Sequence, residues 1–466
     1  MVEVIRQRSI VAAACLAATW LVAAPSEELL TIAQRDAFRS PRAPRTADVS
    51  ADGRLVAFES LARLVPADTD ERPDIYVLDR TTGRVTLESG ALGDLGEHSY
   101  PRISGDGRYI VFESRPPSLN ASRADIVLLD RLTGTTRVLT KTAHSDTPMG
   151  WSRSPDISDD GRVVAFSSAA TTLTDGPDAN GPLEDVYIVQ LPAGTITRAS
   201  VNSAGVQPDH GDSILPSLSA DGRWLAFAST AALDGDPPPG SRRERLVRQV
   251  YLRDAIGGRT TRVTRAVKRA IPNGDSSVPV ISADGRHVVF VSEASNLLAD
   301  DENHAADVFL YDREADAIGW VSRAADGSSA GGESAWPVIS GNGRFVAFQS
   351  DAANLVCAKG SACGPSDPSA KLRVAGSRRA LSDADDDINL LWDIFLFDRT
   401  SGHIVRVSED ELGGWMAPSA GAALDATGKV VAFSSRHPVD ATDRSDDFDL
   451  FVRALTPPGV ITRKSP

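Results

Sequence analysis

Four stretches of the chain carry oxygen-bearing side chains at one shared spacing. Each has an Asp, a second polar residue two positions later and another Asp four positions after that. The candidate ligands are Asp68, Asp70 and Asp74; Asp301, Asn303 and Asp307; Asp387, Asn389 and Asp393; and Asp443 and Asp449. Oxygen ligands two residues apart in a loop suit Ca²⁺. The alternative is an Asx-type turn, in which the carboxylates accept hydrogen bonds from backbone amides.

Two features separate these stretches from EF-hand calcium loops. They lack the glycine that makes the sharp turn of such a loop, and they lack its bidentate glutamate. The turn interpretation is therefore favoured. We expect no cofactor, with calcium as the alternative.

The segments that must position these residues repeat along the chain. The stretch ISADGRHVVFVS at Ile281–Ser292 has six counterparts, and the glycines of the seven copies are Gly53, Gly107, Gly161, Gly222, Gly285, Gly343 and Gly428. Asp-Gly or Asn-Gly supplies the positive φ of a two-residue hairpin turn. The strand after the turn, such as residues 286–292, is apolar on both faces, so it must be covered on both sides.

A third and a fourth strand complete each repeat. DVFLYDR at Asp307 is typical of the third strand, and HIVRVS at His403–Ser408 is typical of the fourth. Four-stranded units that cannot cover both of their faces alone do so when they pack radially. We predict an all-β fold over residues 46–466, a seven-bladed β-propeller of four-stranded antiparallel blades. Either Glu28–Gln34 or Gly459–Ser465 would complete the last blade and close the ring.

The repeat resembles that of a known family. The pattern [IVL]-S-x-D-G-R-x-[VIL]-[AV]-F-x-S, followed by D-[IV]-[YF]-L-x-D, is similar to the TolB-like, WD40-like propeller repeat, and the resemblance implies a propeller. The family often has Ser-Pro-Asp-Gly at the turn, where this chain has Ala, Gly or Asp in place of Pro. TolB carries a domain before its propeller, and prolyl-oligopeptidase-like enzymes carry a hydrolase domain after theirs. Residues 25–45 are too few for the first, and the sequence ends after the last repeat, so neither role is expected.

The N-terminus has the pattern of an export signal. Arg6 and Arg8 precede an apolar run at Ile10–Ala24, and small residues near its end offer a cleavage site. The run is shorter than the about 20 residues that cross a membrane. We therefore predict a signal peptide at residues 1–24, with a retained anchor as the alternative, and a linker or ring-closing segment at residues 25–45. The chain is expected to be exported to the periplasm or the cell exterior.

Two further sets of residues could do chemistry. Cys357 and Cys363 stand in CAKGSAC, and two cysteines of an exported chain most simply pair, with free thiols as the alternative. His98, His144 and His210 precede first strands, where imidazoles could hold a metal near the channel mouth. Their offsets differ from blade to blade, which argues against a shared metal site.

Composition and motifs favour binding over catalysis. The net charge of −14 disfavours nucleic acid as a partner, and no HExxH, P-loop or GxGxxG motif stands in a suitable context. The loops that vary in length all lie on one face, where function tends to gather. We expect a secreted, non-enzymatic propeller that binds a protein or envelope glycan through this loop-bearing face, with membrane contact only through a retained N-terminal segment. The alternative is a carbohydrate-active enzyme, or another hydrolase or lyase, with its site at the channel mouth.

Overall fold

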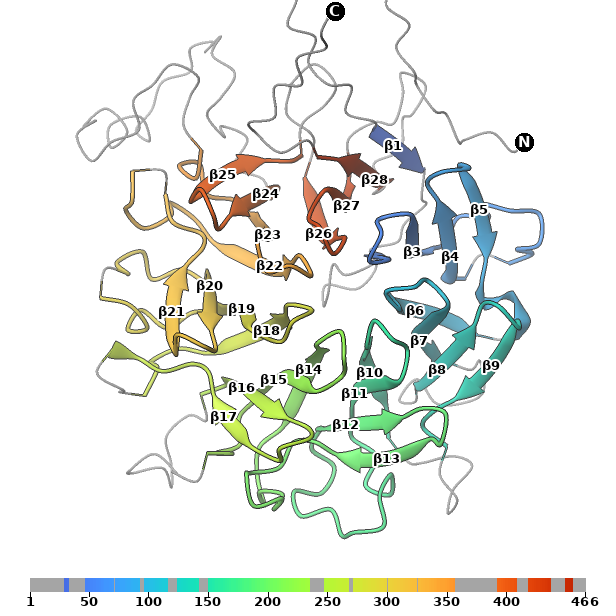
Figure 1. Ribbon diagram of the computed structural model, residues 1–466, viewed down its shortest axis with the longest axis horizontal. Helices are drawn as coiled ribbons and strands as arrows, with labels where there is room; N and C mark the ends of the chain where they lie inside the picture. The colour runs from blue at the N-terminus through green and yellow to red at the C-terminus, as the bar shows by residue number, and fades with distance from the viewer. Residues whose placement is uncertain are drawn as a thin grey trace, which may run out of the picture.

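The structure is a computed structural model. It describes residues 29–32, 47–70, 72–92, 96–115, 124–141, 150–234, 247–267, 271–299, 301–324, 326–356, 392–408, 418–436 and 449–455. These residues form seven four-stranded antiparallel sheets around a common axis (Figure 1), which confirms the all-β, seven-bladed propeller. No helix in this part of the chain is long and apolar enough to cross a membrane.

Six blades are built from consecutive strands, with the first strand innermost (Figure 1). The first three are β2 (Ala47–Val49), β3 (Leu55–Ser60), β4 (Asp74–Asp79), β5 (Arg84–Leu87); β6 (Glu97–Ile103), β7 (Tyr109–Arg115), β8 (Asp125–Asp130), β9 (Thr135–Val138); and β10 (Ser152–Ile157), β11 (Val163–Ser168), β12 (Asp185–Gln190), β13 (Thr195–Arg198). The next three are β14 (Ser213–Leu218), β15 (Trp224–Ser229), β16 (Gln249–Asp254), β17 (Thr260–Arg262); β18 (Ser276–Ile281), β19 (His287–Ser292), β20 (Asp307–Asp312), β21 (Ala317–Trp320); and β22 (Ser334–Ile339), β23 (Phe345–Ser350), β24 (Asp393–Asp398), β25 (His403–Arg406). A short 3-10 helix, η1 (Ser89–Leu92), follows β5.

The seventh blade joins the two ends of the chain. It consists of β26 (Ser419–Leu424), β27 (Val430–Ser435), β28 (Asp449–Ala454) and the N-terminal strand β1 (Leu29–Ile32). β1 pairs antiparallel with β28, so that Leu29 lies opposite Arg453 and Ile32 lies opposite Leu450. The N-terminal candidate thus closes the ring, whereas Gly459–Ser465 lies outside the described residues.

The polar residues of the repeat hold the turns together. In the fifth blade, Ser282 Oγ donates to Asp284 and accepts the backbone N–H of His287. Arg286 then makes two hydrogen bonds, at 3.0 and 2.7 Å, to Asp312 at the end of the third strand. The same Arg–Asp pair recurs as Arg54–Asp79, Arg108–Asp130, Arg223–Asp254 and Arg344–Asp398. The pattern D-G-R with a later Asp therefore encodes a clasp between two turns of one blade.

The turn glycine also packs against the neighbouring blade. Gly285 has a φ of +68°, and a Cβ built on it would lie 2.2 Å from Cδ1 of Trp224 in the preceding blade. Gly343 stands in the same relation to His287, so this histidine packs between the fifth and sixth blades. A side chain at this position would strain the backbone and collide with the adjacent sheet.

The core lies between the blades. The phenylalanine of each second strand, except in the second blade, stacks on an aromatic residue of the third strand, with ring centroids 5.7 to 6.1 Å apart: Phe58–Tyr76, Phe166–Tyr187, Phe227–Tyr251, Phe290–Phe309, Phe348–Phe395 and Phe433–Phe451. These rings and the flanking aliphatic residues form buried clusters shared by two adjacent sheets, such as Leu252 with Val288 and Phe290. The two-sided apolar strands are thereby covered, as predicted.

A series of backbone hydrogen bonds links the inner turns of neighbouring blades. The bonds are Ala51 N to Gly105 O, Gly105 N to Asp159 O, Ala220 N to Ala283 O, Ala283 N to Gly341 O, Asn342 N to Ala426 O and Ala426 N to Ala51 O, at 3.0 to 3.2 Å. The donors at Ala51, Gly105, Ala220, Ala283 and Ala426 occupy the position where related repeats often have Pro. Because Pro has no N–H to donate, these bonds explain why Ala and Gly stand there.

Candidate functional site

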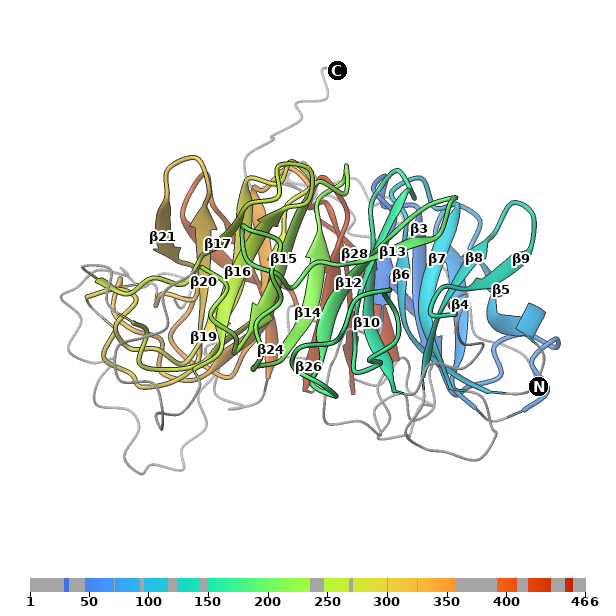
Figure 2. The ribbon, with the colours of Figure 1, turned by 90° about the horizontal axis from the view of Figure 1, so that it is seen from below.

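The two faces of the propeller differ in character. The first and last turns of each blade lie on one face, the turn face, as the turn between β20 and β21 shows at the upper edge of Figure 2. The loops between second and third strands and the connections between blades lie on the other, loop-bearing face. Residues 171–183 belong to a long loop between β11 and β12 on this face. Two further long stretches of the sequence, residues 241–248 and 356–391, fall largely outside the described residues.

Two buried glutamates on the second strands reach across to the next blade. Glu59 Oε2 accepts the backbone N–H of Tyr100 at 2.9 Å, and Glu113 Oε1 accepts that of Ser154 at 2.8 Å. Tyr100 and Ser154 have φ values of 54° and 52° and stand where the pairing register of β6 and β10 shifts. Such a bulge frees backbone N–H groups from the ladder, and the glutamates satisfy them.

Burial changes the acidity of both glutamates. Their side chains belong to residues only 8% and 3% exposed, and this burial raises the pKa of Glu59 to about 8 and that of Glu113 to about 7, against the opposing effect of the backbone hydrogen bonds. The charge of Glu113 adds to the rise at Glu59. Carboxyl groups that stay protonated near neutral pH are typical of functional sites, although structural networks also produce them.

A partly exposed aromatic residue precedes the strand whose bulge Glu113 contacts. Trp151, just before the innermost strand β10, is 37% exposed, and the Arg153 guanidinium lies 4.6 Å from the centre of its ring. Arg153 also forms a double hydrogen bond with Glu184, with Nε 2.6 Å from Oε1. We call Glu59, Glu113, Trp151, Arg153 and Glu184 the channel-mouth cluster. Sequence reasoning missed it, although the glutamates occupy a position that is Ser, Ala, Val or Gln in the other repeats.

The inner strands of the same three blades carry a half-buried ion-pair chain. Arg102 lies between Asp48, at 3.2 Å, and Asp156, at 3.7 Å. The two aspartates also accept the backbone N–H groups of Ile103 and Leu218 in the following blades. The corresponding positions of the other four blades are Ser217, Val280, Val338 and Ala423. Charged groups of the inner strands are thus concentrated in the first three blades.

In the acidic loop of the first blade the three aspartates lie close together, as expected both for a calcium site and for an Asx-type turn. Carboxylate oxygens of Asp68, Asp70 and Asp74 lie within 4.8 Å of one another. Asp68 accepts hydrogen bonds from the Tyr76 hydroxyl and from the Asp70 backbone N–H, and Asp74 accepts one from Ser89. The Asx-type contacts are therefore present, and whether a cation binds there stays a prediction.

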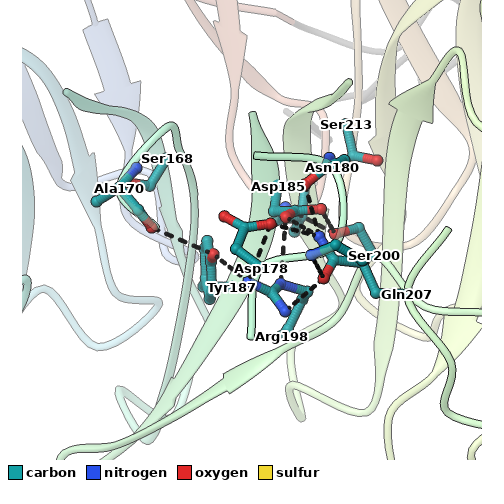
Figure 3. Close-up of polar contacts among 12 residues, drawn as sticks. Ser168, Ala170, Asp178, Asn180, Asp185, Tyr187, Arg198, Ser200, Gln207 and Ser213 are labelled. Carbon is teal, nitrogen blue, oxygen red and sulfur yellow. Dashed lines mark hydrogen bonds and ion pairs between the residues drawn. The ribbon is translucent and has the colours of Figure 1, made fainter. Parts of the chain in front are cut away.

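The third blade has a related loop that the strict spacing missed. Asp178, Asn180 and Asp185 correspond to the other loops with one extra residue before the last Asp. Figure 3 shows that the Gln207 amide nitrogen lies among all three side chains, at 2.8, 2.6 and 2.7 Å from their oxygens. Arg198 on the fourth strand adds its guanidinium, with Nε 3.1 Å from Asp185. Here the protein's own donors stand where a cation would bind.

In the fifth blade, Asp301, Asn303 and Asp307 have fewer donors around them. Asp307 accepts hydrogen bonds from Ser322, at 2.7 Å, and from the Asn303 amide, at 2.9 Å. That amide also donates to the carbonyl of Ala330 at 3.2 Å. Asp393 of the sixth blade is buried and accepts from Ser408, and Asp449 of the seventh is buried. Asp387, Asn389 and Asp443, together with Cys357 and Cys363, lie outside the described residues, so those predictions stay open.

The histidines do not form a metal site within the described residues. His98 is buried with its ring edge-on to Phe112, and burial lowers its pKa to about 4. His210 is exposed and hydrogen-bonded to Asp209. His144 lies outside the described part of the chain, and the metal-ligand grouping found within that part is the one of Asp68, Asp70 and Asp74.

No protein-family model matches the chain, and no curated protein is significantly similar to it in sequence. Similar solved structures include an oligogalacturonate lyase from Vibrio parahaemolyticus, with 10% identity, a TM-score of 0.50, and coverage of 93% of this chain and 98% of the lyase. The β-propeller domain of the trilobed protease from Pyrococcus furiosus has 12% identity, a TM-score of 0.47 and coverage of 91% and 99%. TolB from Acinetobacter baumannii has 14% identity, a TM-score of 0.37 and coverage of 89% and 86%.

At such identities the likeness shows the fold and does not transfer an activity. The chain is a seven-bladed β-propeller, and the solved structures similar to it include TolB and a propeller domain of a protease.

Proposed function

We propose that this protein is an exported binding protein that recognises a protein or a cell-envelope ligand at the channel-mouth cluster of its loop-bearing face. The observation that carries the proposal is the partly exposed Trp151 ring, against which Arg153 packs while Glu184 holds the Arg153 guanidinium. Trp and Arg contribute most to binding at protein interfaces. A fixed aromatic ring backed by a cation also offers a preorganised apolar surface.

The turn face is less suited to binding. Its inner turns are joined by backbone hydrogen bonds, and five of its arginines already clasp aspartates of the same blade. These arginines are committed to stabilising the blades, as Arg153 is to Glu184, but the loop-bearing face also presents the partly exposed Trp151 ring. Export rests on the signal-like pattern of residues 1–24.

Affinity capture of the mature chain from an envelope extract would test the proposal. Trp151→Ala should weaken the captured interaction by about tenfold or more, as expected when an aromatic anchor is truncated. Ile256→Ala is the matched control, because Ile256 is 79% exposed in the turn between β16 and β17, on the opposite face. Equal loss in the two variants, or loss only with Ile256→Ala, would contradict binding at the channel mouth.

A second candidate function is hydrolysis or lyase chemistry, favoured by the raised pKa values of Glu59 and Glu113. A carboxyl protonated near pH 7 can act as a general acid. A panel of envelope polysaccharides, incubated with wild type and with Glu59→Gln and Glu113→Gln, would reveal it. Turnover that the Gln variants lose while binding persists would favour the enzyme, and no turnover by the wild type would favour the binding protein.

A further inference from the structure

We propose that the loop between β19 and β20 in the fifth blade binds one divalent cation, with Ca²⁺ as the expected ion. Asp301, Asn303 and Asp307 would hold it with their side chains, and Ala330 with its backbone carbonyl. The site lies away from the channel-mouth cluster in the sequence and does not depend on the proposed function.

The first and third blades each satisfy the equivalent aspartate with protein donors. In the first blade, the Tyr76 hydroxyl and the Asp70 backbone N–H both donate to Asp68. In the third blade, the Gln207 amide donates to Asp178, and the Arg198 guanidinium lies 3.6 Å from the same carboxylate (Figure 3). Neither aspartate is left as an unpaired buried charge.

The fifth blade lacks the side-chain donors of the other two, although the Asn303 backbone N–H still interacts with Asp301. Phe309 stands where Tyr76 and Tyr187 stand, so no hydroxyl is available, and the residue paired with it is Trp320 instead of Arg198. Asp301 is 8% exposed, and its Oδ1 has no hydrogen-bond partner among the described residues. A buried carboxylate oxygen without a partner is costly, and a bound cation would remove that cost.

The surrounding groups suit a hard cation. An amide nitrogen lies among oxygens in both blades: Gln207 in the third, and Asn303 in the fifth, where its neighbours are Asp307 and the Ala330 carbonyl. A cation in the fifth blade would take this place once the Asn303 amide turns its oxygen inward. The set then consists of oxygens alone and carries two carboxylates, which favours Ca²⁺ over softer metals.

Calcium titration of the EDTA-treated full chain tests this assignment. We expect Asp301→Asn to bind one Ca²⁺ fewer than the wild type in isothermal titration calorimetry. Asp178→Asn is the matched control in the third blade, and its stoichiometry should equal that of the wild type. No Ca²⁺ binding by the wild type, or an unchanged stoichiometry in Asp301→Asn, would overturn the proposal.

Two further measurements separate loss of the ion from loss of the fold. In EDTA, Asp301→Asn should melt no earlier than the wild type, because the substitution removes a buried carboxylate one of whose oxygens has no partner. Added Ca²⁺ should raise the melting temperature of the variant less than that of the wild type. Tb³⁺ alone, bound in place of Ca²⁺, should luminesce through Trp320, and Trp320→Phe should reduce that emission. Terbium emission unaffected by Asp301→Asn and by Trp320→Phe would contradict a site in this blade.

Discussion

One position of the second strand changes its role from blade to blade. It is Glu59 and Glu113 in the first two blades and Ser167, Ala228, Val291, Gln349 and Ser434 in the others. The glutamates accept backbone N–H groups of the next blade's bulge, and their burial keeps them protonated near neutral pH. This single substitution within the repeat makes the channel mouth asymmetric.

At the residue scale, the folded protein should hold the Glu59 proton more tightly than the unfolded chain does. The unfolded pKa is about 4.3, and burial raises the folded pKa to about 8. Between these values the folded state binds more protons, so the free energy of unfolding should fall as the pH rises. Glu59→Gln keeps an acceptor for Tyr100 and should flatten this dependence by up to about 1.4 kcal/mol per pH unit. Urea denaturation from pH 5 to 8 measures it, and parallel slopes for both proteins would contradict the prediction.

The strands and turns were predictable where the residues that specify them lie within one repeat. The Asp-Gly turns and two-sided apolar strands indicated each blade, and β19 begins at His287 where residues 286–292 were expected. The first-strand bulges and the contacts of Glu59 and Arg102 were not predictable, because they depend on which residue of the next blade lies opposite. Likewise, Ala or Gly in place of Pro is explained only by a hydrogen bond to another blade.

At the element scale, two glycine substitutions separate backbone strain from packing. Gly258 has a φ of +72° with nothing within 4 Å of an added Cβ, whereas Gly285 has a φ of +68° with Trp224 at 2.2 Å. Gly258→Ala should lower the free energy of unfolding by about 1–2 kcal/mol for the left-handed backbone. Gly285→Ala should cost about 1–3 kcal/mol more because of the collision. Chemical denaturation of both variants measures the difference. Equal losses of unfolding free energy would show that the adjacent blade moves to make room for the added methyl group.

The whole molecule is a ring whose closure could not be predicted from pattern alone. Glu28–Gln34 and Gly459–Ser465 both had the length and alternation of an outer strand, and only the pairing of β1 with β28 decides between them. The number of blades was predictable because each carries its own turn signal. The propeller also distributes its proposed binding groups unevenly, since the first three blades carry the charged residues of the inner strands.

At the scale of the whole molecule, removing β1 should weaken the ring. A chain that starts at residue 46 leaves the edge of β28 unpaired, whereas a chain that starts at residue 25 retains β1. The shorter chain should melt at a lower temperature and tend to self-associate through the exposed strand edge. Calorimetry and size-exclusion chromatography compare the two. Identical melting temperatures and elution volumes would mean that β1 contributes little to closure.

The pairing of Leu29 with Arg453 also sets an order of events during folding. Each of the first six blades consists of consecutive strands and forms from one continuous segment of the chain. β1 precedes every other described strand, yet its partner β28 follows all of them. Pairings between such distant segments form slowly, because the entropic cost of closing a long loop comes before the gain from their contacts. The seventh blade is therefore the last to form, as the ring closes.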